Sequence, residues 1–148
     1  MEKKIKVAAV GDNCVDAYDQ TGEAFPGGNP VNVAVYTVRL GGEASYTGVV
    51  GDDAYGKLMK DSIAKKGVDV SHLKVMPGST AVTHVEIIDG ERILGDYEEG
   101  VMADFKLSEE DILSALDQIA IYHHGPANCS LPEWHIRYMM KAKWDQCP

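Results

Sequence analysis

The sequence predicts an α/β protein built on a doubly wound, mostly parallel sheet. Three observations lead to this fold class. Short β-rich apolar runs alternate with amphipathic helical segments, turns rich in glycine separate them, and a single hairpin pattern interrupts the alternation. The chain has 148 residues, of which 45% are hydrophobic and 25% charged, and this suits one domain or a large piece of one.

The expected strands are short, and most of them end at a glycine or a polar turn. The first covers residues 4–10, an apolar run that stops at Gly11. The others cover residues 15–18, 44–50, part of 68–75 and 119–123. Segments 80–88 and 92–97 alternate apolar and polar positions around Asp89-Gly90, which is a strong hairpin signal outside the strand–helix alternation. Residues 21–30 are expected to form a loop and a turn, because prolines and glycines concentrate there.

Helices are expected where the apolar spacing becomes helical between capping residues. Pro30 suits the first turn of a helix over 31–40, and Asp53 can cap a helix over 54–66. Ser108 can cap a third helix that runs to about residue 118, and a last helix is expected over about 130–144. We therefore expect helices on both faces of the sheet.

The bulk composition excludes several classes of function. A formal net charge of −9 argues against nucleic acids and anionic membranes as partners, because both require clustered lysine and arginine. No apolar stretch is long enough for a membrane span, and the apolar start is too brief for a signal peptide. Cys14, Cys129 and Cys147 form no CxxC pair, which indicates a reducing cytoplasm and predicts neither a disulfide framework nor a zinc site.

A glycine-rich turn before the first helix is the most informative segment. Gly27-Gly28 allows backbone N–H groups to approach a ligand closely, and the following helix points its N-terminus at the same place. Asn32 lies in the first turn of that helix, where its amide can donate to and accept from a sugar hydroxyl. Taken alone, the two glycines favour the alternative, a tight strand-to-helix turn in which they are purely structural.

Polar residues also follow the first strand, at the end of the sheet where α/β proteins bind ligands. Asp12, Asn13 and Asp16 are expected to cluster where a polyol would sit. The alternative for Asp12 or Asn13 is an Asx turn that caps the strand. His123 ends another strand on the same side; it is a candidate substrate contact, with a core or rim histidine as the alternative.

The spacing of Gly27-Gly28, Asn32, Ala34, Gly41 and Gly51 resembles the first signature of the ribokinase/PfkB family of carbohydrate kinases. The resemblance covers the whole chain and implies a ribokinase-like fold. It also implies a lid of β-strands, here at about residues 14–24 and 79–97. In that family the residues that match Asp16 and Asn32 hold sugar hydroxyls, and backbone matching Gly27 and Gly28 lies against the sugar.

Within the family, segments 11–16, 28–36 and 95–105 are most similar to the kinases that phosphorylate the 6-hydroxyl of a fructosamine such as fructoselysine. Asp12, Asp96, Glu98 or Glu99 could offset the positive charge of such a substrate. For Glu98-Glu99 a solvated acidic turn is the alternative. Other sugar specificities, fructokinase-like or ribokinase-like, stay open, as does a non-catalytic sugar-binding module.

The resemblance implies ATP and Mg²⁺ as cofactors of the whole protein. The family's Asp-Thr-x-Gly-Ala-Gly-Asp-like segment, which supplies the catalytic base and the anion hole, has no match here, and no Walker-type loop occurs. We therefore expect a chain truncated on its C-terminal side, with the catalytic residues beyond residue 148 and no activity of its own. Exposed lid strands also predict a homodimer.

Overall fold

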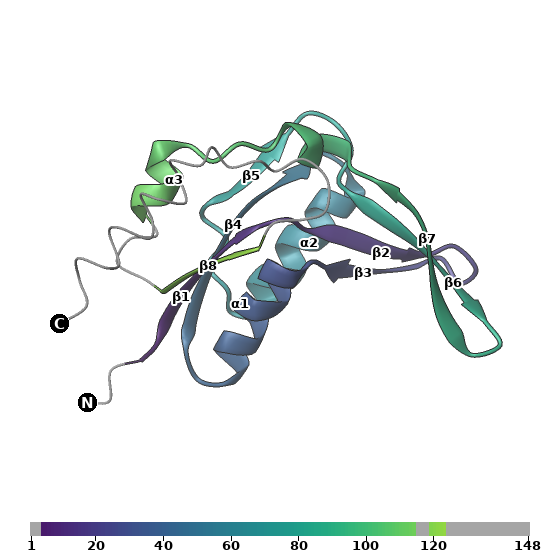
Figure 1. Ribbon diagram of the computed structural model, residues 1–148, viewed down its shortest axis with the longest axis horizontal. Coiled ribbons are helices and arrows are strands. Elements are labelled where there is room, and N and C mark those ends of the chain that lie inside the picture. Colours follow the sequence, from purple (N-terminus) through teal and green to yellow (C-terminus); the bar gives the residue numbers. More distant parts are fainter. Residues whose placement is uncertain (1–3, 115–118, 124–148) are drawn as a thin grey trace.

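The chain forms two β-sheets with helices packed around them, as seen in the computed structural model, which describes residues 4–114 and 119–123 (Figure 1). The elements in chain order are β1 (Lys6–Gly11), β2 (Cys14–Tyr18), β3 (Glu23–Gly27), α1 (Asn29–Arg39), β4 (Glu43–Gly51), α2 (Ala54–Lys65), β5 (Leu73–Met76), β6 (Val82–Ile88), β7 (Glu91–Glu98), the 3₁₀ helix η1 (Gly100–Asp104), α3 (Glu109–Ser114) and β8 (Ile119–His123).

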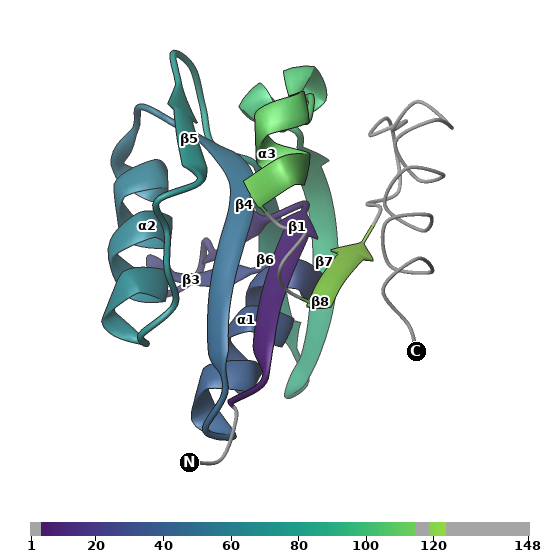
Figure 2. The same ribbon diagram turned by 90° about the vertical axis from the view of Figure 1, so that its left-hand side faces the viewer.

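The main sheet has the strand order β5-β4-β1-β8, and all of its pairs are parallel. Figure 2 shows these strands side by side in that order. In β1 every residue after Lys6 is buried, and in β4 every residue after Glu43 is buried. Such continuous burial is typical of parallel strands covered on both faces. The predicted parallel sheet is confirmed.

Neighbouring strand residues point to opposite faces of the main sheet and enter two separate apolar cores. Ala9, Tyr46 and Val50 join the core formed with α1 and α2. Val10 and Val49 join a second core, formed with η1 and the residues after it. Within the described residues, α1 and α2 cover one face of the sheet, and the 3₁₀ helix η1 with the residues after it covers the other, a helix that the sequence did not predict.

The second sheet has the strand order β3-β2-β6-β7 and projects away from the main sheet (Figure 1). The strands β2 and β6 run parallel, whereas β3 and β7 pair antiparallel with them. The predicted hairpin is confirmed as β6 and β7. Its turn places Asp89 at φ 53° and Gly90 at φ 82°, conformations that Asp-Gly tolerates.

One sequence prediction needs correction. Residues 23–27 are the strand β3, not part of a loop and turn. Pro26 is compatible with this strand because β3 is an edge strand, where a residue without an N–H breaks no ladder. The short strand expected in part of 68–75 is β5, which begins at Leu73, and Asp69 before it makes an isolated bridge to Ser45.

The helix caps follow the sequence closely. Asp53 caps α2 by accepting a hydrogen bond from Gly56 N at 2.7 Å, and Pro30 lies at the start of α1. Ser108 Oγ accepts from Asp111 N at 3.2 Å where α3 begins. The predicted end of that helix at residue 118 and the helix over 130–144 lie outside the described residues.

Within the described ranges, no helix has the length and apolar character to cross a membrane.

Candidate functional site

The two sheets meet at a short junction between β1 and β2, made of Asp12 and Asn13. The Gly27-Gly28 turn packs directly on this junction. A Cβ added to Gly28 would lie 2.8 Å from Asn13 Cα and 2.9 Å from the Asp12 carbonyl oxygen, and the φ of Gly28 is 108°. Both observations require glycine at this position. Gly28 thus packs against the protein's own backbone, as a tight structural turn would, and a close approach of a ligand to this turn stays a prediction.

Asp16 points from β2 toward the same turn, and its side chain is 20% exposed. A Cβ on Gly27 would lie 3.3 Å from Asp16 Oδ2 and 3.4 Å from Oδ1, so the carboxylate rests over this glycine. The Cys14 thiol lies 3.8 Å from Oδ1. Arg92 Nη2, from β7, donates to Oδ2 at 2.7 Å. The carboxylate is therefore held next to the glycine turn while part of it still faces solvent.

Asn13 faces inward instead of toward solvent. It is 1% exposed, and its amide nitrogen donates to Tyr46 Oη and to the Val49 carbonyl, each at 2.8 Å. Tyr46 Oη in turn donates to the Gly11 carbonyl at 2.9 Å. Asn13 Oδ1 is buried without a hydrogen-bond partner. These bonds fix the carboxyl ends of β1 and β4 beneath the junction, and a substrate contact of Asn13 stays a prediction.

The other predicted site residues lie around the same junction. Asn32 is exposed in the first turn of α1, and its backbone N–H donates to the Gly28 carbonyl at 3.0 Å. The backbone of His123 pairs in register with Gly11, at the carboxyl end of β1. The structure thus brings Asp12, Asp16, the two glycines and the start of α1 together, and it places the His123 backbone at the same edge of the main sheet.

Sequence reasoning missed Arg92 as a neighbour of Asp16. The pair is separated by 76 positions and depends on the packing of β7 beside β6. The only signal in the sequence is that Arg92 is the sole lysine or arginine within the four strands of the second sheet.

Of the acidic residues considered for a cationic substrate, Glu98 has another partner. His84 Nδ1 lies 2.9 Å from Asp19 Oδ2, and His84 Nε2 lies 3.3 Å from Glu98 Oε1. Both hydrogen bonds raise the pKa of His84 above its ordinary value of 6.5, and the bond to Asp19 has the larger effect. These three side chains join β6 to the turn after β2 and to the end of β7.

A second polar cluster lies at the carboxyl ends of β4 and β5. Thr80 Oγ1 donates to Asp53 Oδ1 at 2.6 Å, Thr80 N donates to Asp53 Oδ2 at 2.9 Å, and Gly51 N donates to Thr80 Oγ1 at 2.9 Å. Burial alone would raise the pKa of Asp53, but the bonds from Thr80 and Gly56 outweigh it and leave that pKa below its usual value.

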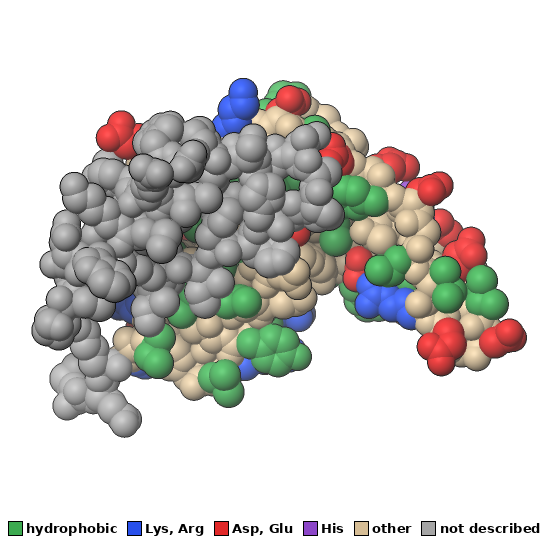
Figure 3. All heavy atoms as spheres, in the orientation of Figure 1, with side chains coloured by type: hydrophobic (Ala, Val, Ile, Leu, Met, Phe, Trp, Pro, Cys, Tyr) green, Lys and Arg blue, Asp and Glu red, His purple; other side chains and the backbone are tan. Residues whose placement is uncertain are grey.

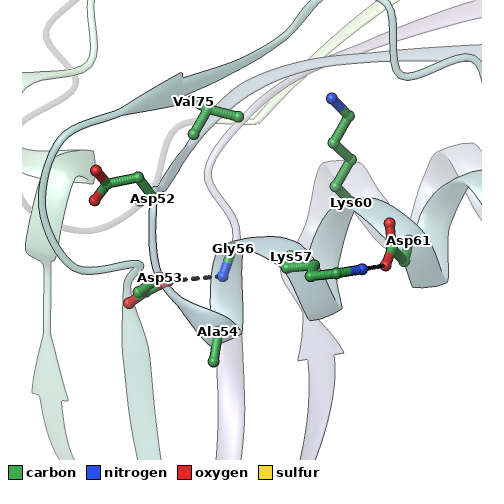
Figure 4. A pocket seen from close by; sticks show the side chains of 9 residues that line it. Asp52, Asp53, Ala54, Gly56, Lys57, Lys60, Asp61 and Val75 are labelled. Carbon is green, nitrogen blue, oxygen red and sulfur yellow. Dashed lines mark hydrogen bonds and ion pairs between the residues drawn. The ribbon is translucent and has the colours of Figure 1, made fainter.

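The Asp53 cluster forms the rim of a pocket of about 490 Å³ at the start of α2. Figure 4 shows Asp53 bonded to Gly56 and Lys57 paired with Asp61 along its wall. These bonds identify Asp53 as a helix cap and Lys57 and Asp61 as a surface ion pair. Across residues 4–114 and 119–123, no cluster of three or more His, Cys, Asp or Glu side chains is arranged to hold a metal ion.

A parallel sheet between helices, with a small second sheet beside its carboxyl edge, defines this chain as an α/β protein of the ribokinase-like class. Solved structures support this fold. A 2-dehydro-3-deoxygluconokinase from Thermotoga maritima matches with a TM-score of 0.73 at 18% identity, over 96% of this chain and 48% of its own. A fructokinase with bound ATP from Xylella fastidiosa matches with a TM-score of 0.62 at 27% identity, over 82% and 39%.

The model of the pfkB family carbohydrate kinases matches residues 2–143, and the chain belongs to that family. It is 47% identical over 146 residues to fructoselysine 6-kinase of Escherichia coli K12, a match that covers 94% of this chain and 56% of that protein. It is 37% identical over 90 residues to a fructosamine kinase of Bacillus subtilis, covering 60% and 32%. The chain therefore spans about half the length, or less, of these curated relatives.

Proposed function

We propose that this chain forms the sugar-binding part of an ATP-dependent kinase that phosphorylates the 6-hydroxyl of a fructosamine such as fructoselysine. The observation that carries the proposal is the position of Asp16, a partly exposed carboxylate over Gly27 at the carboxyl edge of the main sheet. The 47% identity to a fructoselysine 6-kinase supports the choice of sugar.

Each residue of the site has a physical role in this proposal. The Asp16 carboxylate accepts hydrogen bonds from two sugar hydroxyls, and charge-assisted bonds of this kind are the strong ones. The Gly27-Gly28 backbone forms the floor, and Asn32 offers its amide from the exposed first turn of α1. The second sheet acts as a lid that excludes water, because water would otherwise compete with the sugar for the phosphoryl group.

ATP and Mg²⁺ are the cofactors of the proposed reaction, but the described residues do not fit them. They contain no phosphate-binding glycine loop followed by lysine and serine or threonine, and none of their acidic groups is arranged around a metal ion. We assign phosphate binding and the catalytic base to the rest of the whole protein. On this assignment the 148-residue chain binds the sugar but transfers no phosphoryl group.

The test is Asp16→Asn, with fructoselysine affinity measured by isothermal titration calorimetry. We expect affinity to fall about 10- to 100-fold, because the sugar loses charge-assisted acceptors at that site. Asp61→Asn is the matched control, because Asp61 is an exposed acidic residue on α2 that pairs with Lys57. The affinity of this variant for fructoselysine should equal that of the wild type. Equal affinity in the Asp16 variant and the wild type would remove Asp16 from the site.

Radiolabelled ATP tests whether phosphoryl transfer requires the rest of the whole protein. Incubation of the chain with labelled ATP and fructoselysine should give no labelled sugar, and turnover would refute the assignment of catalysis to the rest of the protein.

A fructokinase-like specificity is the second candidate, because the chain is 37% identical over 112 residues to a fructokinase of Klebsiella pneumoniae. Tighter binding of fructose than of fructoselysine would favour it.

We also propose that the second sheet pairs two copies of the chain. Among the described residues neither of its edge strands pairs with a further strand, and every residue of the edge strand β7 is exposed. Open edges tend to pair. Light scattering should show a dimer whose proportion rises with concentration, and a strictly monomeric profile would refute the pairing.

A further inference from the structure

One face of the second sheet carries Asp16 and turns away from the core around α1 and α2. Cross-strand partners share a face of a sheet. Asp16 therefore lies on the same face as its partners Phe25 and Thr83, and Tyr97 lies there because it pairs with Thr83. Ile87, four residues after Thr83 on β6, is also on this face, and so is its partner Arg92. The opposite face packs through Val15, Ala17 and Val82 into the core. We call the first the Asp16 face. Its principal side chains are Asp16, Tyr18, Phe25, Arg92, Leu94 and Tyr97.

The Asp16 face has one cation in strands that are otherwise acidic. The strands β2, β3, β6 and β7 contain six carboxylate residues, and Arg92 is their only lysine or arginine. An anionic group that docks on the Asp16 face therefore has Arg92 as its only lysine or arginine partner within these four strands, and His84 pairs with Ala17 on the opposite face. In Figure 3 the second sheet stands out as an arm beside a hollowed surface, with Lys or Arg atoms next to Asp or Glu atoms on the arm.

Arg92 reaches Asp16 from two strands away, a distance of about 10 Å between the backbones of β7 and β2. Its side chain therefore lies across β6, along the Asp16 face. The side chain is 48% exposed, and the bond to Asp16 uses only Nη2. Because a guanidinium has five N–H donors in a planar fork, Arg92 can bind a second carboxylate while it keeps its bond to Asp16.

The surroundings of Arg92 are apolar and exposed. Tyr18 and Phe25 form an edge-to-face pair with ring centroids 5.7 Å apart. Phe25 is 50% exposed, Leu94 62% and Tyr97 43%. Large apolar side chains exposed together on one face commonly mark a binding surface. An apolar surface with a single arginine suits a ligand that has an aliphatic chain ending in a carboxylate.

We propose that the Asp16 face is a subsite for the non-sugar part of the substrate: Arg92 binds the carboxylate of an amino acid attached to the sugar through its side-chain amine. This inference rests on the proposed function. The amine sits on carbon 1 of the sugar and the reacting hydroxyl on carbon 6, at opposite ends, so the amino acid extends away from the site of transfer. Phe25, Leu94 and Tyr97 pack against its aliphatic chain.

The experiment compares three ligands on the 148-residue chain by calorimetry: fructoselysine, the same compound without its carboxylate (fructosyl-cadaverine), and fructose. We expect the wild type to bind fructoselysine about 10- to 100-fold more tightly than fructosyl-cadaverine, as a charged hydrogen bond predicts. In Arg92→Gln this preference should disappear. Arg39→Gln is the control, because Arg39 lies on α1 over the Tyr36 ring, and it should keep the preference.

Each other result has a distinct meaning. If Arg92→Gln changes the affinity for all three ligands by the same factor, Arg92 only positions Asp16 or competes with the sugar for it, and the subsite is refuted. Equal wild-type affinity for all three ligands refutes the subsite and leaves the sugar site intact. Failure to bind any of them refutes both. Arg92 is half exposed, so Arg92→Gln should keep the wild-type circular dichroism spectrum, and Arg92→Lys tests whether charge alone restores the preference.

Discussion

Gly28→Ala tests how tightly the junction between the sheets is packed. The added Cβ would meet Asn13 Cα at 2.8 Å and the Asp12 carbonyl oxygen at 2.9 Å. Both contacts are backbone atoms, and Asn13 is anchored by bonds to Tyr46 and Val49. Relief therefore requires the β1–β2 connection to move. Overpacking of this kind costs about 1–3 kcal/mol.

Backbone strain adds to the cost of Gly28→Ala. The φ of Gly28 is 108° with ψ at 137°, a conformation that L-residues rarely adopt. Such strain costs about 1–3 kcal/mol, so we expect a total loss of about 2–6 kcal/mol in the free energy of unfolding. This is a large fraction of the stability of a typical domain.

The assay is urea unfolding followed by circular dichroism, and Gly22→Ala is the matched control. Gly22 also has a positive φ, of 71°, but a Cβ added there would meet no atom within 4 Å, so this variant reports backbone strain without overpacking. We expect Gly28→Ala to lower the unfolding midpoint clearly more than Gly22→Ala at a similar slope. Equal losses in the two variants would refute the steric argument.

Two further predictions concern titratable clusters. Asp53→Ala should lower the free energy of unfolding by about 2–4 kcal/mol, because α2 loses its cap and the Thr80 donors lose their acceptor. Because the pKa of folded Asp53 is lowered, its contribution is present above pH 3.8 and is lost as pH falls through the folded value, so the wild type and the variant should converge in acid. The raised pKa of His84 has the opposite sign: its bonds to Asp19 and Glu98 stabilise the fold fully below pH 6.5 and fade as pH rises through the folded pKa. The stability difference between the wild type and His84→Gln should therefore shrink as pH rises above 6.5 through the folded pKa of His84, and a constant difference would contradict this.

Local sequence patterns predicted most of the elements because local physics decides them. The apolar run of β1, the proline and glycines that bound α1, and the Asp-Gly turn of the hairpin act within a few residues. The edge strand β3 was missed for the same reason. Pro26 and Gly27 signal a turn locally, and only the position of β3 at the edge of a sheet makes them acceptable in a strand.

The site was less predictable because its details depend on contacts between distant segments. Position in the chain predicted that Asp12 and Asp16 lie near the glycine turn, as they do. It did not predict that Asn13 turns inward, because its partners on β4 are 33 and 36 residues away. Nor did it predict Arg92, whose bond to Asp16 exists only once four strands are assembled.

The junction of Asp12 and Asn13 has a mechanical consequence. These two residues are the whole connection between a strand at the centre of the main sheet and a strand inside the second sheet. A rotation of one sheet against the other must therefore alter the torsion angles of the same residues that border the glycine turn. A ligand bound at the junction can prefer one angle between the two sheets. By thermodynamic linkage, the ligand then shifts the population toward that angle, and the free energy of this shift equals the change in binding free energy that the angle causes. Under the proposed function, the residues that border the bound sugar are therefore also the residues whose torsion angles change when one sheet rotates against the other.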